Sequence, residues 1–205
     1  MLAELLLSLS LDPAAAPDPL AETLARVEGL TAYQLTLHGQ GPEGEERLRY
    51  HYQDPGHIRL DMITPFAGAV LVYRPDTHRV QVWPFGTRGP RLSLRPDHRL
   101  VRSARGHRID QSDVASLLRD VQRLQRHGRL EAPQEVVLDG QRLWYLLVEG
   151  TAPPGEVARY ELWLDVDSLF PHRVVSRDAA GGLLERVRLE DVVLDPVLDT
   201  GLFAP

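Results

Sequence analysis

The amino-acid sequence predicts a single α+β domain in which two helices accompany one long antiparallel sheet. Three observations support this fold class. Apolar residues alternate with polar ones over most of the chain, as in strands with one buried face. Apolar residues at helical spacing occur in two segments, one near the start and one in the middle. Finally, the 205 residues suit one domain, and no linker-like stretch divides them.

The first 17 residues form an apolar segment that resembles the hydrophobic region of a secretory signal. The run over residues 1–11 is too short to span a bilayer, which takes about 20 apolar residues. Ala14-Ala15-Ala16 supplies a possible cleavage site, whereas Glu4 interrupts the run and no basic residue precedes it. Two interpretations stay open, an export signal or a small amphipathic helix packed on the body. The folded domain is expected over residues 18–205.

The first helix is predicted to begin at Asp18-Pro19 and to end at Gly29. Asp18 can cap the free N–H groups, and Pro19 is tolerated at the first helical position. Leu20, Leu24 and Val27 then fall on one face.

After Gly29 the period changes to two and predicts an antiparallel meander of roughly six short strands before Pro84. The turn signals between them include residues 39–44, Asp54-Pro55-Gly56 and Pro75-Asp76. The alternating segments are centred on residues 33–37, 48–52, 58–62, 69–73 and 80–82.

A second helix is predicted over residues 110–126, where one side is apolar and Gly128 follows as a stop. Strands then resume on either side of the Asp139-Gly140 hairpin turn. The remaining strands are predicted over residues 160–166, 171–177 and 184–194.

Composition excludes several classes of protein. The chain has no Cys, which rules out disulfide scaffolds, thiolate zinc sites, cysteine nucleophiles and a lipid-modified N-terminal Cys. A net charge of -6 argues against nucleic acid as the main partner. There is no glycine-rich phosphate loop, no H-E-x-x-H, no G-x-S-x-G and no visible nucleophile–base pair, so a hydrolase is the least favoured class. We expect no enzyme activity, no cofactor and no metal.

Two polar groups are weak candidates for a metal or acid/base site. His51 and His57 flank a turn and could meet Asp61, although their alternation with apolar residues predicts a solvated face. Asp165 and Asp167 flank the end of a strand at a spacing that could hold a divalent cation, and this spacing is also typical of simple turns.

An Arg-rich stretch over residues 88–108 carries seven Arg and only one acidic residue, Asp97. This stretch could bind a phosphate-bearing headgroup or an acidic partner, with Arg95, Arg99 and Arg102 as the candidate contacts. The alternative is a solvated edge that balances the acidic remainder of the chain.

The alternating strands place many apolar side chains on one face of the sheet. If the sheet curls without closing, this face becomes a trough that is either a packed core or a cavity for an acyl chain. The candidate cavity residues on the strands are Leu35, Leu48, Tyr50, Ile58, Leu60, Met62, Val80 and Val82. Those on the covering helix are Leu117, Leu118 and Val121.

The order of these signals resembles that of the periplasmic outer-membrane lipoprotein carrier family. The LolA-like carriers, LolB and the lipoprotein-sensing anti-sigma regulators are its members. The resemblance covers residues 18–205 and is most specific near the end of the chain. There, Leu169-Phe170-Pro171, Gly181-Gly182, Asp195-Pro196 and Phe203-Ala204-Pro205 follow one another with strands between them.

The resemblance implies a strongly curved sheet forming an incomplete β-barrel, with helices covering an apolar cavity on its concave face. It implies a periplasmic, monomeric carrier of lipoprotein acyl chains or other lipid, served by an inner-membrane transporter and an outer-membrane acceptor. The missing Cys fits the soluble carrier better than the lipid-anchored receptor. The carriers have a basic residue before the Pro of the second turn, where this chain has Asp54, so the lid latch implied by the family is not expected here. A regulatory or scaffold module that binds a protein through its groove or Arg-rich edge remains the alternative.

Overall fold

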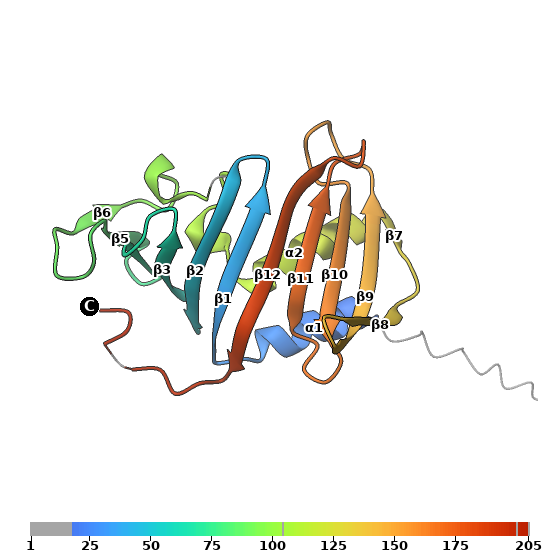
Figure 1. Cartoon of the computed structure of the whole chain (residues 1–205), viewed down its shortest axis with the longest axis horizontal. Coiled ribbons are helices and arrows are strands. Elements are labelled where there is room, and N and C mark those ends of the chain that lie inside the picture. Colours follow the sequence, from blue (N-terminus) through green and yellow to red (C-terminus); the bar gives the residue numbers. More distant parts are fainter. Residues whose placement is uncertain (1–17, 104, 200, 205) are drawn as a thin grey trace, which may run out of the picture.

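The computed structural model describes residues 18–103, 105–199 and 201–204, so the expected signal segment lies outside the described residues. Figure 1 shows two helices and a large sheet. The helices are α1 (Pro19–Glu28) and α2 (Val114–Arg126), with short 3-10 turns η1 (Arg99–Val101) and η2 (Ile109–Gln111) between β6 and α2. The strands are β1 (Ala32–Gly41), β2 (Gly44–Gln53), β3 (His57–Thr64), β4 (Val70–Arg74), β5 (Arg79–Trp83), β6 (Leu92–Leu94), β7 (Gly128–Leu130), β8 (Gln134–Leu138), β9 (Gln141–Gly150), β10 (Arg159–Asp165), β11 (Pro171–Arg177) and β12 (Leu183–Leu194).

All 12 strands belong to one antiparallel sheet with the order β6-β5-β4-β3-β2-β1-β12-β11-β10-β9-β7, and β8 pairs with β9. The first and last long strands, β1 and β12, pair in the middle of the sheet. The sheet is strongly curved and does not close, so the predicted incomplete barrel is confirmed. Five strands, β1–β5, precede Pro84, where the sequence pattern predicts roughly six. The pattern does not predict β6 and β7, which have only three residues each.

Both helices lie on the concave face of the sheet, behind the strands in the view of Figure 1. The Asp18 carboxylate caps α1 by accepting from the backbone N–H of Leu20 at 3.0 Å. The Asp113 carboxylate accepts from the N–H of Ser116 at 2.9 Å, which explains why α2 begins at Val114 rather than at residue 110. No helix among the described residues is long and apolar enough to cross a membrane.

The main hydrophobic core lies between the helices and the concave face. Tyr33 on β1 stacks on Tyr50 and Tyr52 of β2, with ring centroids 5.9 and 4.8 Å away, and meets the edge of Phe170 at 5.4 Å. Leu118 and Val121 of α2 are completely buried against this face. This side of α2 is therefore packed closely on the concave face.

A second, smaller core lies on the convex face of β3–β5, where the C-terminal segment crosses the sheet. Phe203 packs there against Val70, Val72 and Trp83. The Phe203 ring centroid lies 5.6 Å from that of His57. The Phe203 ring explains why His57 is half-buried, whereas the alternation predicts a solvated position. His51 is also half-buried, and its Nε2 atom lies 3.5 Å from an Asp61 carboxylate oxygen.

Candidate functional site

An apolar cavity of about 170 Å³ lies between the concave face and the start of α2. Strands β1, β2, β10, β11 and β12 form one wall, and α2 with the loop that precedes it forms the other. The apolar lining residues are Leu35, Leu37, Tyr50, Val114, Leu117, Val157, Tyr160, Val174, Val187 and Leu189.

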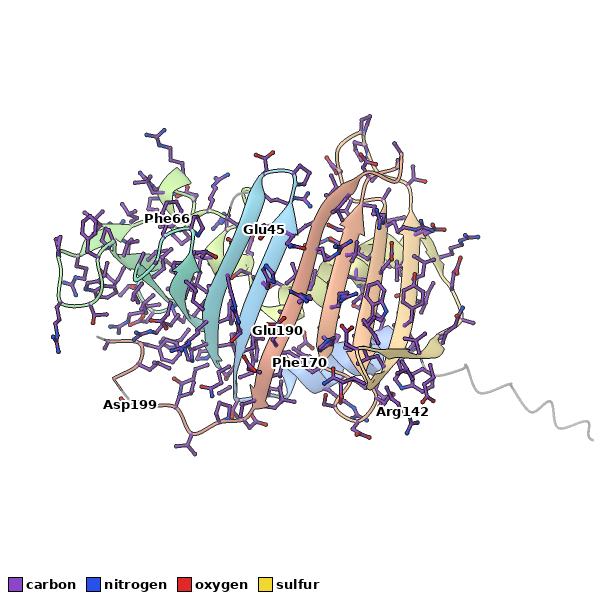
Figure 2. The ribbon with its side chains drawn as sticks, in the orientation of Figure 1. Glu45, Phe66, Arg142, Phe170, Glu190 and Asp199 are labelled. Atoms are coloured by element: carbon purple, nitrogen blue, oxygen red, sulfur yellow. The ribbon has the colours of Figure 1, made fainter. Side chains whose placement is uncertain are left out.

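Four of the charged or titratable residues of the lining gather at one end of the sheet, whereas Asp113 and Asp120 belong to the α2 wall. Glu46 follows the β1–β2 turn closely, and Glu185 follows the β11–β12 turn. We call this the mouth end of the sheet; Figure 2 marks it with Glu45, near the top of the view. Arg105 and His107 reach the same rim from the loop before α2.

The tyrosines of the cavity wall stay neutral. Burial raises the pKa of Tyr160 to about 12 and raises that of Tyr50 further. The Tyr50 hydroxyl lies 3.5 Å from the hydroxyl of Ser112, so its polar end faces the loop before α2. The sheet side of the inner wall is therefore uncharged at Tyr50 and Tyr160 and suited to an aliphatic chain.

Two contacts tether the loop before α2 across the rim. The Arg105 guanidinium donates to the Ser176 hydroxyl at 3.2 Å, and the His107 Nε2 atom lies 3.5 Å from a Glu185 carboxylate oxygen. A hydrogen bond to Glu185 raises the pKa of His107, whereas burial and Glu185 together raise the pKa of Glu46. The rim is thus a coupled set of ionisable groups around an apolar interior.

The predicted cavity residues are divided between this cavity and the core. Leu35, Tyr50 and Leu117 line the cavity. Leu48, Val80, Leu118 and Val121 lie in the buried core, and Leu60, Met62 and Val82 are half-buried against it. Sequence reasoning missed the contributions of β10–β12, although Tyr160 alternates in phase with the buried Leu162 and Leu164.

The Arg-rich stretch lies outside the cavity except for Arg105. Arg95, Arg99 and Arg102 are all exposed. Arg95 donates twice to the Asp97 carboxylate, at 3.1 Å, and the Arg102 Nε atom donates to the Asp97 carbonyl oxygen at 3.2 Å.

A second, more polar cleft of about 470 Å³ lies near the opposite end, where β2 turns into β3. Ile58 lines this cleft with Tyr52, Tyr73 and several acidic residues, including Asp54. Arg119 of α2 lies in it, 2.7 Å from Glu28 of α1, so this contact joins the two helices. Asp54 therefore lines an acidic cleft, where a basic latch residue was implied by the family pattern.

The two candidate metal or acid/base groups, one around His51 and one around Asp165, make contacts within the fold. His51 lies 3.5 Å from the Asp61 carboxylate, which also accepts from Arg59 at 2.7 Å. Asp165 accepts from the backbone N–H and the hydroxyl of Ser168, both at 2.8 Å, and so shapes a turn. Within the described residues, no group of three or more His, Asp or Glu could hold a metal ion.

Comparison with solved structures confirms the LolA-like fold. An uncharacterized conserved protein from Thermus thermophilus matches with a TM-score of 0.59 and 18% identity over 92% of this chain and 94% of that one. The MucA/MucB complex of Pseudomonas aeruginosa matches with a TM-score of 0.57 and 18% identity, over 91% and 59%. The lipoprotein LppX of Mycobacterium tuberculosis gives 0.51 and 13%, over 88% and 97%. No family model and no curated protein matches the sequence.

Proposed function

We propose that this chain is an exported, non-enzymatic lipid-binding protein that holds an acyl chain in the cavity under α2. The observation that carries the proposal is the cavity itself, because apolar side chains make up most of its exposed lining and most of its charged residues stand at the rim. Burial of a chain there gains about 0.8 kcal/mol for each CH₂ group.

The size of the cavity limits what it holds in this conformation. A dry apolar cavity of roughly 150 Å³ is large enough for benzene. A cavity of about 170 Å³ therefore accommodates a segment of a single acyl chain. A longer lipid requires the loop before α2 to move, which means separating Arg105 from Ser176 and His107 from Glu185.

Within this proposal the cargo is the acyl part of a lipoprotein or another lipid, carried in the periplasm toward the outer membrane. Transfer would involve an inner-membrane transporter and an outer-membrane acceptor, and the carrier would act as a monomer. The fold shared with the lipoprotein LppX, and the resemblance of residues 18–205 to the carriers, support this assignment.

A regulatory module that binds a protein is the second candidate. One of the solved structures with this fold is a complex of two proteins, MucA and MucB. A groove or an Arg-rich edge of this chain would then receive a protein segment instead of a lipid. If the Arg-rich edge is the binding surface, filling the cavity leaves partner binding unchanged.

Filling the cavity tests the proposal. The substitutions Leu117→Trp and Val187→Trp place indole rings at two walls of the cavity, and Leu24→Trp on α1 is the control because Leu24 packs on the core away from it. Titration with a fluorescent long-chain fatty acid should give at least a tenfold weaker affinity for each cavity variant and wild-type affinity for the control. Equal affinities in all four proteins would contradict the proposal.

A further inference from the structure

Large apolar side chains are exposed near one edge of the sheet. Among the described residues, eight such side chains are exposed, and five of them lie between residues 63 and 100. The most exposed of the five are Phe85, at 82%, Phe66, at 69%, and Leu100, at 63%; Leu92 and Ile63 complete the set. Single exposed apolar residues are common, but a gathering of this kind marks an interaction surface.

The strand register brings the two phenylalanines to the same end of the sheet. Arg47 pairs with Thr64, so the loop after β3, which carries Phe66, lies at the mouth end beside the β1–β2 hairpin. Val70 pairs with Trp83, so the loop after β5, which carries Phe85, leaves the sheet in the same direction.

The two loops also lie against each other. A β-carbon added to Gly86 would lie 3.7 Å from the carbonyl oxygen of Gly68. Figure 2 labels Phe66 in this region, toward the left of the view.

The chain segment that carries Phe85, Leu92 and Leu100 is rich in positive charge. Residues 84–108 carry seven Arg and one Asp, a formal charge of +6, whereas the rest of the chain carries 16 Arg and 28 acidic residues, a formal charge of −12. Arg88, Arg91 and Arg99 are exposed and form no ion pair with any described residue. The molecule is therefore acidic overall but strongly basic around Phe85.

We propose that this surface, comprising Phe66, Phe85, Leu92 and Leu100 with Arg88, Arg91 and Arg99, docks on an anionic lipid bilayer. Aromatic and aliphatic side chains at loop tips can enter the interfacial region of a membrane, while Arg attracts anionic headgroups. The anionic bilayer would repel the rest of the chain, which carries a formal charge of −12. The charge distribution therefore orients the protein with this surface toward the bilayer.

A bilayer fits this surface better than a folded protein partner does. The apolar side chains stand on separate loops next to exposed Arg, whereas a protein interface places few charges at its apolar centre. The cavity rim lies at the same end of the sheet. Docking therefore brings the rim to the membrane, where a chain could enter or leave with little exposure to water.

Vesicle flotation tests this inference without any ligand in the cavity. The wild-type chain should float with phosphatidylcholine vesicles that contain phosphatidylglycerol and stay unbound with pure phosphatidylcholine. Binding should weaken as NaCl rises, because the Debye length falls from about 30 Å at 0.01 M to about 8 Å at 0.15 M. Equal binding to both kinds of vesicle would overturn the electrostatic part of the proposal.

Paired variants localise the effect. Two variants should each weaken vesicle binding at least about tenfold. One is the double variant Phe66→Ser/Phe85→Ser, and the other is the triple variant Arg88→Gln/Arg91→Gln/Arg99→Gln. The control for the apolar variant is Val137→Ser with Val197→Ser, because both positions are also exposed and apolar. The control for the charge variant is a triple substitution that removes the same charge elsewhere: Arg123→Gln, Arg126→Gln and Arg129→Gln. If the controls lose as much binding as the test variants, the surface is not the docking site.

The inference goes beyond lipid binding and fails separately from it. In vesicle-free solution, the Phe66→Ser/Phe85→Ser variant should take up the fluorescent fatty acid with wild-type affinity. A wild-type chain that takes up fatty acid but never floats would overturn docking alone. Docking on the bilayer would also be overturned if the chain does not float with protein-free vesicles but binds a membrane-anchored protein through the three Arg. That result would favour a protein partner.

Discussion

The hydroxyl group of Tyr33 on β1 accepts a hydrogen bond from the backbone N–H of Val114, the first residue of α2, over 3.0 Å. The first N–H groups of a helix have no partner within the helix, so a side chain from the sheet satisfies one of them. Both groups are buried, and 81 residues separate them in the chain. This bond fixes the start of α2, which forms one wall of the cavity, to the opposite wall.

Removing this hydroxyl group should loosen α2. We expect Tyr33→Phe to lower the free energy of unfolding by about 1–3 kcal/mol, because the buried N–H of Val114 loses its acceptor. Tyr52→Phe is the control, since Tyr52 stacks on Tyr33 and its hydroxyl forms no hydrogen bond with a described residue. Urea denaturation of the three proteins measures the difference, and equal midpoints and slopes for both variants would contradict the anchoring role.

The C-terminal segment should contribute to stability through Phe203. This side chain is 8% exposed and fills the small core on the convex face. We expect Phe203→Ala to lower the free energy of unfolding by about 3 kcal/mol. Phe66→Ala removes an exposed ring and should change it by no more than about 0.5 kcal/mol. Thermal unfolding that shifts equally in both variants would show that the segment does not stabilise the sheet.

Asp61 should stabilise the fold in a pH-dependent way. Burial opposes ionisation, but hydrogen bonds from His51 and Arg59 outweigh it and lower the pKa of Asp61 to about 2. Because this pKa is lower in the folded state, the stabilisation is complete above the unfolded pKa of about 3.9 and is lost as pH falls toward 2. Asp61→Asn should therefore cost roughly 2 kcal/mol at pH 7 and much less near pH 2.

Asp76 provides a close control for this prediction. Like Asp61, it pairs with an Arg two residues earlier in the chain, Arg74 in this case, but it is exposed. Urea denaturation between pH 2 and 7 should show little effect of Asp76→Asn. A cost of Asp61→Asn that stays constant over this pH range would refute the assignment.

His107 should slow ligand exchange below neutral pH. The hydrogen bond to Glu185 raises the pKa of His107, and the charge of Asp120 also raises it. Burial and the charge of Arg105 lower it. Glu46 also faces the rim. A raised pKa means that the contact is complete below the unfolded value of about 6.5 and is lost as pH rises through the folded value. Fatty-acid dissociation should therefore quicken as pH rises through the raised pKa of His107.

The substitution His107→Gln should remove this pH dependence and give fast dissociation throughout. His127→Gln, at the far end of α2 and away from the cavity, should behave as the wild type does. Stopped-flow displacement of the fluorescent fatty acid between pH 5.5 and 8.5 separates the two outcomes. A wild-type rate that is independent of pH would exclude a role of the His107–Glu185 contact in ligand exchange.

The fold was largely predictable because its signals are local. Alternation fixes which residues of β1–β5 face the core, and the Asp18 cap fixes the start of α1. The cavity was less predictable because its position depends on how α2 rests on the sheet. Leu117 and Leu118 are neighbours with the same chemistry, yet Leu117 lines the cavity and Leu118 is completely buried in the core.

Long-range contacts account for the other differences. The alternation predicts a solvated face for His51 and His57, but Phe203, about 150 residues further along the chain, packs near the His57 ring. The Arg-rich stretch was recognisable by composition. Its proximity to Phe66 arises only from the strand register, because these residues belong to different loops.

Native mass spectrometry of the protein purified from its own host, followed by lipid extraction, tests the central proposal most directly. We predict that a fraction of the molecules carries one acyl-chain lipid and that Leu117→Trp and Val187→Trp reduce this fraction sharply, whereas Leu24→Trp does not. A protein that always arrives without lipid and takes up no fatty acid when offered it would contradict the account.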